Sequence, residues 1–468
     1  MNDRVIKLAL AAIVGAYLLL AVLYAQAIPK WNAPDEPSHF NYIRNVAERR
    51  EFPVLQVGDY DFDYLEKAKA AKFPDTMPVD RIRYESHQPP LYYTLAAPLY
   101  LLTMPLSLNV QVLLLRLFST ALGALTILTA YWTARRMFPN EALVFLGVPA
   151  FAAFVPMHTA MTAAINNDAL GNLLLSVILL VLAGRLVSCG QPEGAPAPTA
   201  TFAGSRSSVP PCLRGFVLSL ASEPVVLGGL LGLGLLTKTT TYIAIVLIAY
   251  VILCQELAGG VRLRAFLMST KRLFGIGLIA LLISGWWFVR NASMYGDLDI
   301  LARKRHDLVV AGQPLTGIFD WPAASHFVTV SFRSFWAQFG WMGILVDNRI
   351  YLLYAVLSAV ALVGLTVFGV RALLRPRRVF QAQGLLLGLL LLCYILLLGG
   401  VVQYNLIYVQ AQGRYLFPAI VPIATFFVLG WRELLPVRWR SPVFLVLFAG
   451  LMVLNIAIIF RHIVPSFG

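Results

Sequence analysis

QAQGLLLGLLLLCYILLLGGVV, residues 381–402, contains no charged side chain and is long enough to cross a lipid bilayer as one α-helix. Similar apolar segments recur along the chain, and within them apolar residues follow one another without alternation. This pattern excludes an outer-membrane barrel, in which lipid-facing and lumen-facing residues alternate. The sequence therefore predicts an all-α polytopic membrane protein.

About eleven segments are long and apolar enough to be membrane helices. They lie near residues 5–27, 111–134, 141–157, 169–187, 224–237, 240–258, 272–290, 350–370, 381–402, 414–431 and 442–460. The segment 224–237 is short and could merge with its neighbour or break at Lys238. Segment 5–27 could be a signal peptide cleaved after Ala27, but it is longer than the usual apolar region of about 7–15 residues and is expected to be retained.

The composition supports this class of protein. Hydrophobic residues make up 59% of the 468 residues and charged residues 13%. A soluble chain is about 45–50% apolar and about 25% charged. Intrinsic disorder, a disulfide-stapled secreted domain and a soluble enzyme are thereby excluded. The formal net charge of +14 is best explained by basic loops next to an anionic cytoplasmic leaflet, so no nucleic-acid partner is expected.

One apolar segment, residues 91–108, decides the sides of all later loops. It contains Pro98 and Pro105. Cytoplasmic loops carry an excess of Lys and Arg, and four basic clusters face the cytoplasm only if this segment does not cross the membrane. These clusters are Arg135/Arg136, Arg262/Arg264/Lys271/Arg272, Arg371/Arg375/Arg377/Arg378 and Arg432/Arg438/Arg440. The segment is therefore predicted to be a re-entrant or interfacial helix.

This topology gives one transmembrane domain over residues 1–468 with three notable loops. Residues 28–90 form a first outer loop, and residues 291–348 form a second one. Residues 188–222 are rich in Gly, Pro, Ser and Ala, so they are predicted to be a flexible cytoplasmic linker.

The first outer loop contains adjacent carboxylates at Asp35 and Glu36, followed by Pro37. Pro37 suits the first turn of a helix, and acidic side chains suit the positive end of its dipole. Apolar residues then recur at helical spacing, which predicts an interfacial helix with its apolar side on the membrane. From spacing alone, a helix cap and a catalytic pair are equally good interpretations of the two carboxylates.

Further ionisable residues lie where the outer ends of other helices are expected, namely Asp168, Lys238 and Arg414. Ionisable groups at such depth are energetically expensive and point to function. Alternatively, the side chains of Lys238 and Arg414 extend to the membrane surface, with their aliphatic parts in lipid and their charged ends in water. Carboxylates and cations on one membrane face could together deprotonate a hydroxyl and bind a phosphate.

The order of the motifs resembles that of the GT-C glycosyltransferases. The motifs are Pro34-Asp35-Glu36-x-x-His39, Glu85-x-His87-Gln88-Pro89-Pro90, Asn167-Asp168-Ala169-Leu170, Gly234-Leu235-Leu236-Thr237-Lys238 and Gly413-Arg414-Tyr415-Leu416-Phe417-Pro418. The pattern is similar to the branch of protein O-mannosyltransferases and aminoarabinose transferases, and most similar to a bacterial family of poorly characterised relatives. The resemblance covers nearly the whole chain. It implies a GT-C-like helical bundle in a bacterial inner (plasma) membrane, with the active site facing outward.

The resemblance also implies roles for individual residues. Asp35 matches the catalytic base, Asp168 a second acid of the site, and Lys238 and Arg414 match contacts to a lipid phosphate. The predicted site residues are Asp35 and Glu36 as catalytic groups, and His39, Glu85, His87, Asp168, Lys238, Arg414 and Tyr415 as substrate-binding groups. His87 stands near the position of a phosphate-binding Lys in aminoarabinose transferases. A divalent metal ion could also bind, with Asp35, His87 and Asp168 as candidate ligands.

The implied reaction is the transfer of a sugar from a polyprenyl-phosphate donor to an acceptor hydroxyl, with inversion at the anomeric carbon. The acceptor could be a glycan, a lipid or a protein. Two alternatives remain open. A polyprenyl-lipid transporter or flippase would need polar groups near the middle of the bilayer, and a non-catalytic subunit of a membrane complex would not need Asp35.

Overall fold

The structure is a computed structural model that describes residues 2–189, 223–258, 263–316, 320–374 and 382–468. The linker predicted at 188–222 lies almost wholly outside these residues. So do Arg262, Arg375, Arg377 and Arg378 of the predicted basic clusters.

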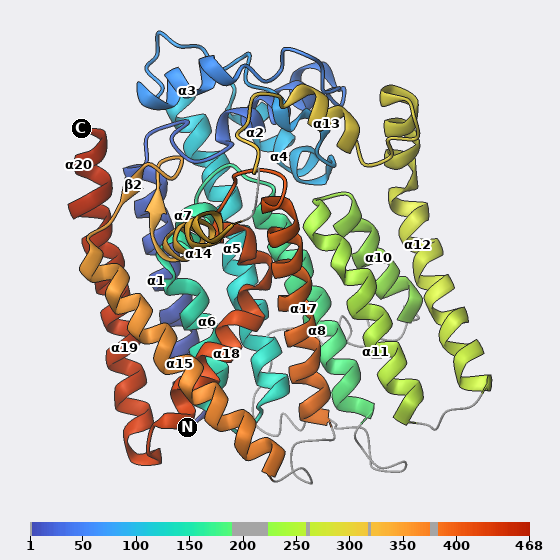
Figure 1. Cartoon of the computed structure of the whole chain (residues 1–468), viewed down its shortest axis with the longest axis vertical. Coiled ribbons are helices and arrows are strands. Elements are labelled where there is room, and N and C mark those ends of the chain that lie inside the picture. Colours follow the sequence, from blue (N-terminus) through green and yellow to red (C-terminus); the bar gives the residue numbers. More distant parts are fainter. Residues whose placement is uncertain (1, 190–222, 259–262, 317–319, 375–381) are drawn as a thin grey trace.

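Nine helices in the described part of the chain are long and apolar enough to cross a membrane. They are α1 (Asp3–Ala27), α5 (Leu108–Met137), α8 (Asp168–Cys189), α11 (Ala244–Ala258) with the preceding 3₁₀ turn η2 (Thr239–Ile243), α12 (Leu263–Tyr295), α15 (Asn348–Leu374), α17 (Ala382–Asn405), α18 (Ile420–Leu434) with the preceding 3₁₀ turn η3 (Gly413–Ala419), and α19 (Val437–Ile458), which η4 (Ile459–Ile463) and α20 (Val464–Phe467) extend. The helices stand side by side as a bundle (Figure 1). The prediction of an all-α polytopic membrane protein is confirmed.

Two of the expected spans have a different form. Residues 141–157 become α6 (Ala142–Phe154) and α7 (Pro156–Thr162), which are bent by 69° relative to each other. The bend lies at Val155, which is extended because a residue before proline disfavours the helical conformation. Residues 224–237 form α10 (Glu223–Leu235), a helix of 13 residues that ends just before Lys238. Counting the bent pair as one span gives ten long spans in the described residues.

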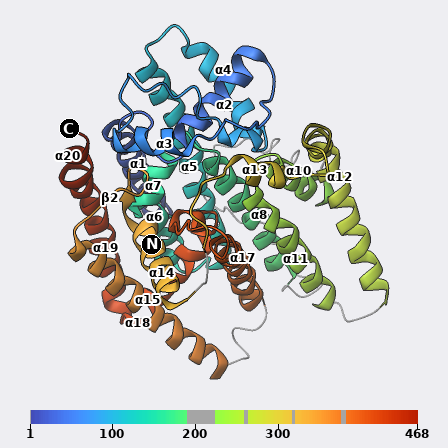
Figure 2. The ribbon, with the colours of Figure 1, turned by 45° about the horizontal axis from the view of Figure 1, so that its top comes forward.

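The connections between helices alternate between two ends of the bundle, and the two long loops share one of them, here called the loop end. The elements at the loop end are α2 (Glu36–Arg49), α3 (Phe62–Ala70), η1 (Tyr84–His87), α4 (Leu91–Thr103), α13 (Arg303–Val309), α14 (Trp321–Trp336) and the antiparallel strands β1 (Gln338–Phe339) and β2 (Ile344–Leu345). Figure 2, in which the top of the molecule comes forward, shows α2, α3 and α4 grouped above the bundle.

Helix α2 is buried inside the loop end, which differs from the predicted position on the membrane surface. Its apolar residues Phe40, Ile43 and Ala47 are buried, and so are polar residues on its other faces. Phe40 packs edge-on against Tyr100 of α4, with ring centroids 5.7 Å apart. The prediction of an apolar side resting on lipid is therefore wrong, because α4 covers that side.

Helix α4 occupies most of the ambiguous segment 91–108. It has 13 residues, so it is about 20 Å long, whereas the apolar core of a bilayer is about 30 Å thick. Its length therefore fits a helix that does not cross the membrane alone. A turn at residues 104–107 leads directly into the long helix α5.

The helices that carry the C-terminal motifs pack backbone to backbone. A Cβ atom on Gly364 of α15 would lie 1.9 Å from the carbonyl oxygen of Gly430 in α18. A Cβ atom on Gly430 would lie 2.1 Å from the carbonyl oxygen of Ala361. Small residues allow such close crossings between membrane helices. The crossing fixes α18, and with it η3 and Arg414 at the loop end.

Candidate active site

The backbone turns sharply at Asp35, immediately before α2. Asp35 has φ 66° and ψ −5°, a left-handed conformation that is uncommon for a residue with a side chain. It is the residue that precedes the helix, but its carboxylate makes no capping hydrogen bond. The helix-cap interpretation is therefore wrong for Asp35. Strained backbone of this kind is often found at functional sites.

The Asp35 carboxylate instead contacts two distant segments. The hydroxyl of Tyr84 in η1 donates to Oδ1 over 2.7 Å, and Arg414 Nη2 donates to Oδ2 over 2.7 Å. The side chain keeps 23% of its surface exposed, whereas that of Arg414 keeps only 4%. Asp35 is thus held from both sides while one part of it remains accessible.

Glu36 points elsewhere and is completely buried. Arg116 of α5 donates to both carboxylate oxygens, from Nε over 2.7 Å and from Nη2 over 2.6 Å. The backbone N–H groups of Trp31 and Ile165 donate to the same carboxylate. A carboxylate with four donors and no exposed surface cannot reach a substrate. This placement does not fit the predicted catalytic role of Glu36. It indicates that Glu36 holds the start of the first outer loop against α5.

Lys238 and Asp168 form a second ion pair at the loop end. Asp168 is the first residue of α8, and Lys238 lies in extended backbone between α10 and η2. Lys238 Nζ lies 2.6 Å from Asp168 Oδ1. Both side chains are largely buried, with exposed fractions of 17% and 21%. Because each predicted cation is paired with a carboxylate inside the protein, neither Lys238 nor Arg414 reaches for the membrane surface as the alternative interpretation required.

Arg414 is anchored by its neighbours in η3. Its Nε atom donates to Gln412 Oε1 over 2.5 Å, and its guanidinium carbon lies 5.2 Å from the ring centroid of Tyr415. The preceding residue must be glycine, because a Cβ atom on Gly413 would lie 2.0 Å from the carbonyl oxygen of Ser331 in α14. The Gly-Arg-Tyr motif therefore combines a close backbone approach with a fixed guanidinium.

His39 and Glu85 line the same cavity as these two ion pairs. The Nδ1 atom of His39 is 2.9 Å from the hydroxyl of Tyr93, and the imidazole is buried. Burial lowers the pKa of His39, while the charges of four nearby groups also act on it. These groups are Glu85, Asp35, Lys238 and Asp168. The imidazole therefore lies within electrostatic reach of both ion pairs, which brings the motifs from four parts of the chain together.

Glu85 differs from the other carboxylates of the site. Its backbone N–H donates a hydrogen bond to Ser38 Oγ over 2.8 Å, which fixes the position of the residue. Its Oε2 atom is buried and has no hydrogen-bond partner within the described part of the chain. Buried polar atoms normally have partners, and an exception calls for an explanation such as a bound ligand. Glu85 Oε2 is therefore available to accept a hydrogen bond from a substrate hydroxyl.

His87 pairs with a histidine from the second outer loop. Its ring lies 4.8 Å from that of His306 in α13, and its Nδ1 atom lies 3.0 Å from the carbonyl oxygen of Tyr84. Burial, followed by the charge of His306, lowers the pKa of His87 to about 3. The imidazole is therefore neutral at physiological pH, so it can hydrogen-bond a phosphate but cannot replace a lysine as a cation.

A single cavity of about 820 Å³ joins these residues. All the predicted site residues except Glu36 line it, namely Asp35, His39, Glu85, His87, Asp168, Lys238, Arg414 and Tyr415. On the side of η2, α12 and α17 the lining becomes apolar, with Ile243, Trp287, Phe288, Leu396, Leu397 and Val401. The cavity thus has a charged centre and an apolar side between membrane helices.

The predicted metal ligands do not fit a metal site. No group of three His, Cys, Asp or Glu side chains within the described ranges is arranged to hold an ion. Two of the three candidates have cations of the protein as partners, since Asp35 contacts Arg414 and Asp168 contacts Lys238. The third, His87, contacts a backbone carbonyl and His306. Lys238 and Arg414 are cations that the described residues contribute to this site.

Electrostatics determine the protonation state of Asp35. Burial alone would raise its pKa, but the charges of Arg414 and His39 and the hydrogen bond from Tyr84 outweigh this effect. The pKa of Asp35 is therefore held well below its usual range. In this state Asp35 is an ionised but weak base.

Sequence reasoning missed several residues that shape the site. Tyr84 and Gln412 hold the two partners of the Asp35–Arg414 pair, and Arg116 holds Glu36. Tyr84 and Gln412 are immediate neighbours of motifs that were identified, so proximity in sequence was an available signal. For Arg116, no signal in its own apolar segment indicated Glu36 as the partner.

Comparisons with known proteins support a fold assignment. No protein-family model and no curated protein matches the sequence. Among solved structures, the oligosaccharyltransferase of Archaeoglobus fulgidus in the apo form has a TM-score of 0.51 and 14% identity, over 96% of this chain and 55% of that chain. The same enzyme with Zn and sulfate has a TM-score of 0.50 and 14% identity, over 95% and 52%.

A third solved structure is ArnT from Cupriavidus metallidurans bound to undecaprenyl phosphate, with a TM-score of 0.49 and 15% identity, over 100% of this chain and 74% of that chain. The chain spans only about half the length of the oligosaccharyltransferase. At these identities the likeness concerns the fold. The helices of this chain are arranged similarly to those of the Archaeoglobus fulgidus oligosaccharyltransferase.

Proposed function

We propose that the protein transfers a sugar from a polyprenyl-phosphate donor to an acceptor hydroxyl at the loop end of the bundle. The observation that carries the proposal is the single cavity in which Asp35, Lys238 and Arg414 meet and whose lining becomes apolar between membrane helices. A lipid-linked phosphate sugar has matching parts, which are an apolar chain, an anionic phosphate and a polar sugar.

The apolar side of the cavity fits the polyprenyl chain. Its walls come in part from α12 and α17, which are candidate membrane spans. Burial of apolar surface contributes about 25 cal/mol per Å². The chain of the donor would thus provide binding energy and place its phosphate at the charged centre.

The two cations fit the phosphate, and Asp35 fits the role of general base. In the proposed reaction the acceptor oxygen forms a bond to the anomeric carbon while its proton passes to Asp35. The bond between the anomeric carbon and the phosphate oxygen breaks, and polyprenyl phosphate leaves with the electron pair. Lys238 and Arg414 stabilise the negative charge that develops on this leaving group. Attack from the side opposite the phosphate inverts the anomeric centre.

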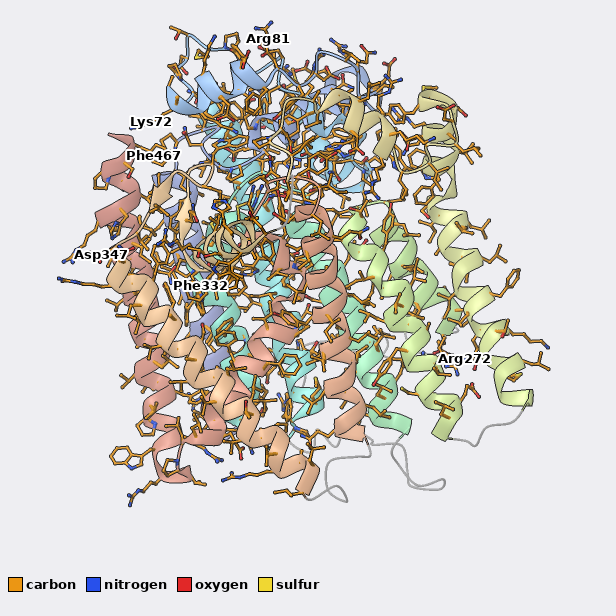
Figure 3. The ribbon with its side chains drawn as sticks, in the orientation of Figure 1. Lys72, Arg81, Arg272, Phe332, Asp347 and Phe467 are labelled. Carbon is orange, nitrogen blue, oxygen red and sulfur yellow. The ribbon has the colours of Figure 1, made fainter. Side chains whose placement is uncertain are left out.

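The proposed orientation places the loop end outside the cell. Arg272 lies toward the opposite end of the bundle, whereas Lys72 and Arg81 lie at the loop end (Figure 3). The loop end also carries many acidic residues that pair with its cations, such as Asp75 with Lys30 and Asp80 with Arg44. The last turns of α5, α15 and α18, away from the loop end, carry Arg135 and Arg136, Arg371 and Arg432, as expected beside cytoplasmic loops. We propose that the protein lies in a bacterial inner membrane with this site facing outward.

The orientation predicts the accessibility of two exposed positions in a cysteine-free background. Val57 in the first outer loop is 73% exposed, and Val437 at the start of α19 is 77% exposed. In intact cells a membrane-impermeant maleimide is expected to label Val57→Cys and to leave Val437→Cys unlabelled until the membrane is permeabilised. The reverse pattern would place the site on the cytoplasmic side.

A second prediction concerns the phosphate. Arg414→Gln and Lys238→Gln should each weaken the binding of undecaprenyl phosphate by about 1.5–3 kcal/mol, the contribution of a hydrogen bond to a charged group. This corresponds to about a 10- to 150-fold increase in Kd, measured on purified protein in detergent. Arg461→Gln is the matched control, since it removes an exposed cation from η4 that does not line the cavity. Equal affinities for all three variants would show that Lys238 and Arg414 do not bind the phosphate.

The flippase alternative is less well supported by the described residues. A transporter needs its polar site near the middle of the bilayer, at broken helices. Here Asp35, His39 and Glu85 lie in the loop region, and Asp168 and Lys238 lie at the ends of helices. Transfer of a labelled sugar from a polyprenyl-phosphate donor by purified protein in proteoliposomes tests the proposed function directly. Movement of the donor lipid across the bilayer without transfer would support the alternative.

A further inference from the structure

The ion pairs made by the adjacent carboxylates Glu36 and Asp35 differ in how firmly they are closed. Glu36 and Arg116 are 0% and 3% exposed, and both carboxylate oxygens are bonded to the guanidinium. Asp35 and Arg414 share one hydrogen bond, and Asp35 remains 23% exposed to the cavity. The first pair is built to stay closed, whereas the second has an open side that faces the space for a ligand.

Each partner of the second pair also has an anchor of its own. Tyr84 donates to Asp35 Oδ1, the oxygen that does not contact Arg414. Gln412 Oε1 accepts from Arg414 Nε, a nitrogen that does not contact Asp35. Each partner therefore keeps a hydrogen bond to its own anchor when the hydrogen bond between the pair is broken.

The anchor of Arg414 continues as a row of glutamines. Gln412 Nε2 donates to Gln410 Oε1 over 2.9 Å, and Gln410 Nε2 donates to Gln313 Oε1 over 3.2 Å. Burial raises the pKa of the Tyr60 hydroxyl, Gln313 lies close enough to lower it, and the ring of Tyr60 packs edge-on against that of Tyr84 at 5.5 Å. The row thus returns to the residue that holds Asp35, and its members line the cavity. This network fixes both anchors relative to each other.

We infer that the Asp35–Arg414 pair is a latch that the donor phosphate opens, with Tyr84 as a positioning residue for the released base. The inference rests on the proposed function. In the free protein Arg414 holds the carboxylate. When a phosphate oxygen accepts the hydrogen bond from Arg414 Nη2, Asp35 keeps its hydrogen bond from Tyr84, loses the one from Arg414, and the phosphate offsets the charge of the guanidinium. An anion beside a carboxylate raises its affinity for a proton, whereas a neighbouring cation lowers it. Asp35 therefore becomes an effective base only after the donor has bound, and the reaction is ordered with the donor first.

The latch has a consequence for binding that a simple catalytic base does not have. In the wild type the phosphate must compete with the Asp35 carboxylate for Arg414. Asp35→Asn removes the negative charge and the competition. Undecaprenyl phosphate is therefore expected to bind to Asp35→Asn about 5- to 10-fold more tightly than to the wild type, since charge-assisted hydrogen bonds are roughly twice as strong as neutral ones.

The matched control is Asp307→Asn. Asp307 also lines the cavity, but it pairs with His306 and not with Arg414. Its replacement removes one negative charge from the same cavity and is expected to change the affinity less than about twofold, because exposed charges are screened by solvent. A gain shared equally by both variants would show general electrostatics and would overturn the latch.

A second pair of variants guards against misfolding. Asp35→Ser removes the same charge with a smaller side chain and is expected to show the same gain in affinity. Tyr84→Phe keeps the charge of Asp35 but removes its anchor. It is expected to leave the Kd for undecaprenyl phosphate within about twofold of the wild type and to lower kcat about 10-fold or more, a loss that saturating donor does not restore. An unchanged kcat in Tyr84→Phe would overturn the positioning role.

The closing experiment measures the Kd of undecaprenyl phosphate for the wild type, Asp35→Asn, Asp35→Ser, Asp307→Asn and Tyr84→Phe, each purified in detergent and monodisperse. Tighter binding by the two Asp35 variants alone is the expected result. Binding by the wild type with no gain in the Asp35 variants overturns the latch and leaves the proposed function standing. If neither the wild type nor any variant binds, the proposed function fails, and the latch fails with it.

Discussion

Protein with Asp35→Asn is expected to transfer sugar about 10²- to 10⁴-fold more slowly than the wild type, the usual contribution of general acid–base catalysis. Asparagine keeps the size of the side chain and can still accept the hydrogen bond from Tyr84, but it cannot take the proton of the acceptor. The measurement is the rate at which a labelled sugar leaves a polyprenyl-phosphate donor in proteoliposomes, at saturating donor concentration.

Two controls separate this effect from a general loss of charge. Asp307→Asn removes a carboxylate from the same cavity at a position away from Arg414 and should keep most of the activity. Glu36→Gln changes the adjacent carboxylate, which lies outside the cavity, and should retain its turnover number once corrected for the folded fraction. Normal turnover by folded Asp35→Asn would show that Asp35 is not the general base of the reaction.

The low pKa of Asp35 is compatible with this role only if the resting structure is not the reacting one. A general base works best when its pKa lies near the operating pH. In the structure the charge of Arg414 keeps Asp35 well below its usual range. Binding of a phosphate by Arg414 changes this balance in the direction that catalysis needs. The same ion pair thus explains both a weak base in the free protein and an effective base in the donor complex.

The fold was largely predictable because membrane helices are encoded locally. A continuous apolar segment such as residues 382–402 forms a helix whatever its neighbours are, since backbone groups in lipid must bond within the segment. The break at Val155 was harder to foresee, because Pro149 lies inside a helix whereas Pro156 begins a new one. Which of two prolines bends a chain depends on the helices packed around it.

The candidate site was predictable as a set of residues but not as a set of contacts. The motifs predicted Lys238 and Arg414 as contacts to one phosphate, and both residues line the same cavity. They could not tell Asp35 from Glu36, because the left-handed backbone at Asp35 sends the two adjacent side chains in different directions. The apolar face of α2 gave a similar ambiguity, since lipid and helix α4 are equally suitable apolar surroundings.

The largest effect on stability is expected at Arg116. Its Nη1 atom donates to the carbonyl oxygens of Ala25 and Ile28 over 2.7 and 2.6 Å, and its Nη2 atom also donates to Pro29. Together with Glu36 it ties the end of α1 and the start of α2 to α5. Removing one partner of a buried ion pair costs about 3–5 kcal/mol, because the other charge is left without compensation.

Arg116→Met is therefore expected to destabilise the protein by about 3–5 kcal/mol, and Glu36→Gln by less. The difference arises because Arg116 keeps its three carbonyl partners when Glu36 is neutralised, whereas Glu36 keeps only the N–H groups of Trp31 and Ile165 when Arg116 is lost. The temperature at which the monodisperse protein disappears in detergent ranks the variants. The double variant should recover part of the loss, because it removes the unpaired buried charge. A double variant less stable than Arg116→Met, or a Glu36→Gln protein that is fully stable but inactive, would contradict a structural role and return Glu36 to the chemistry.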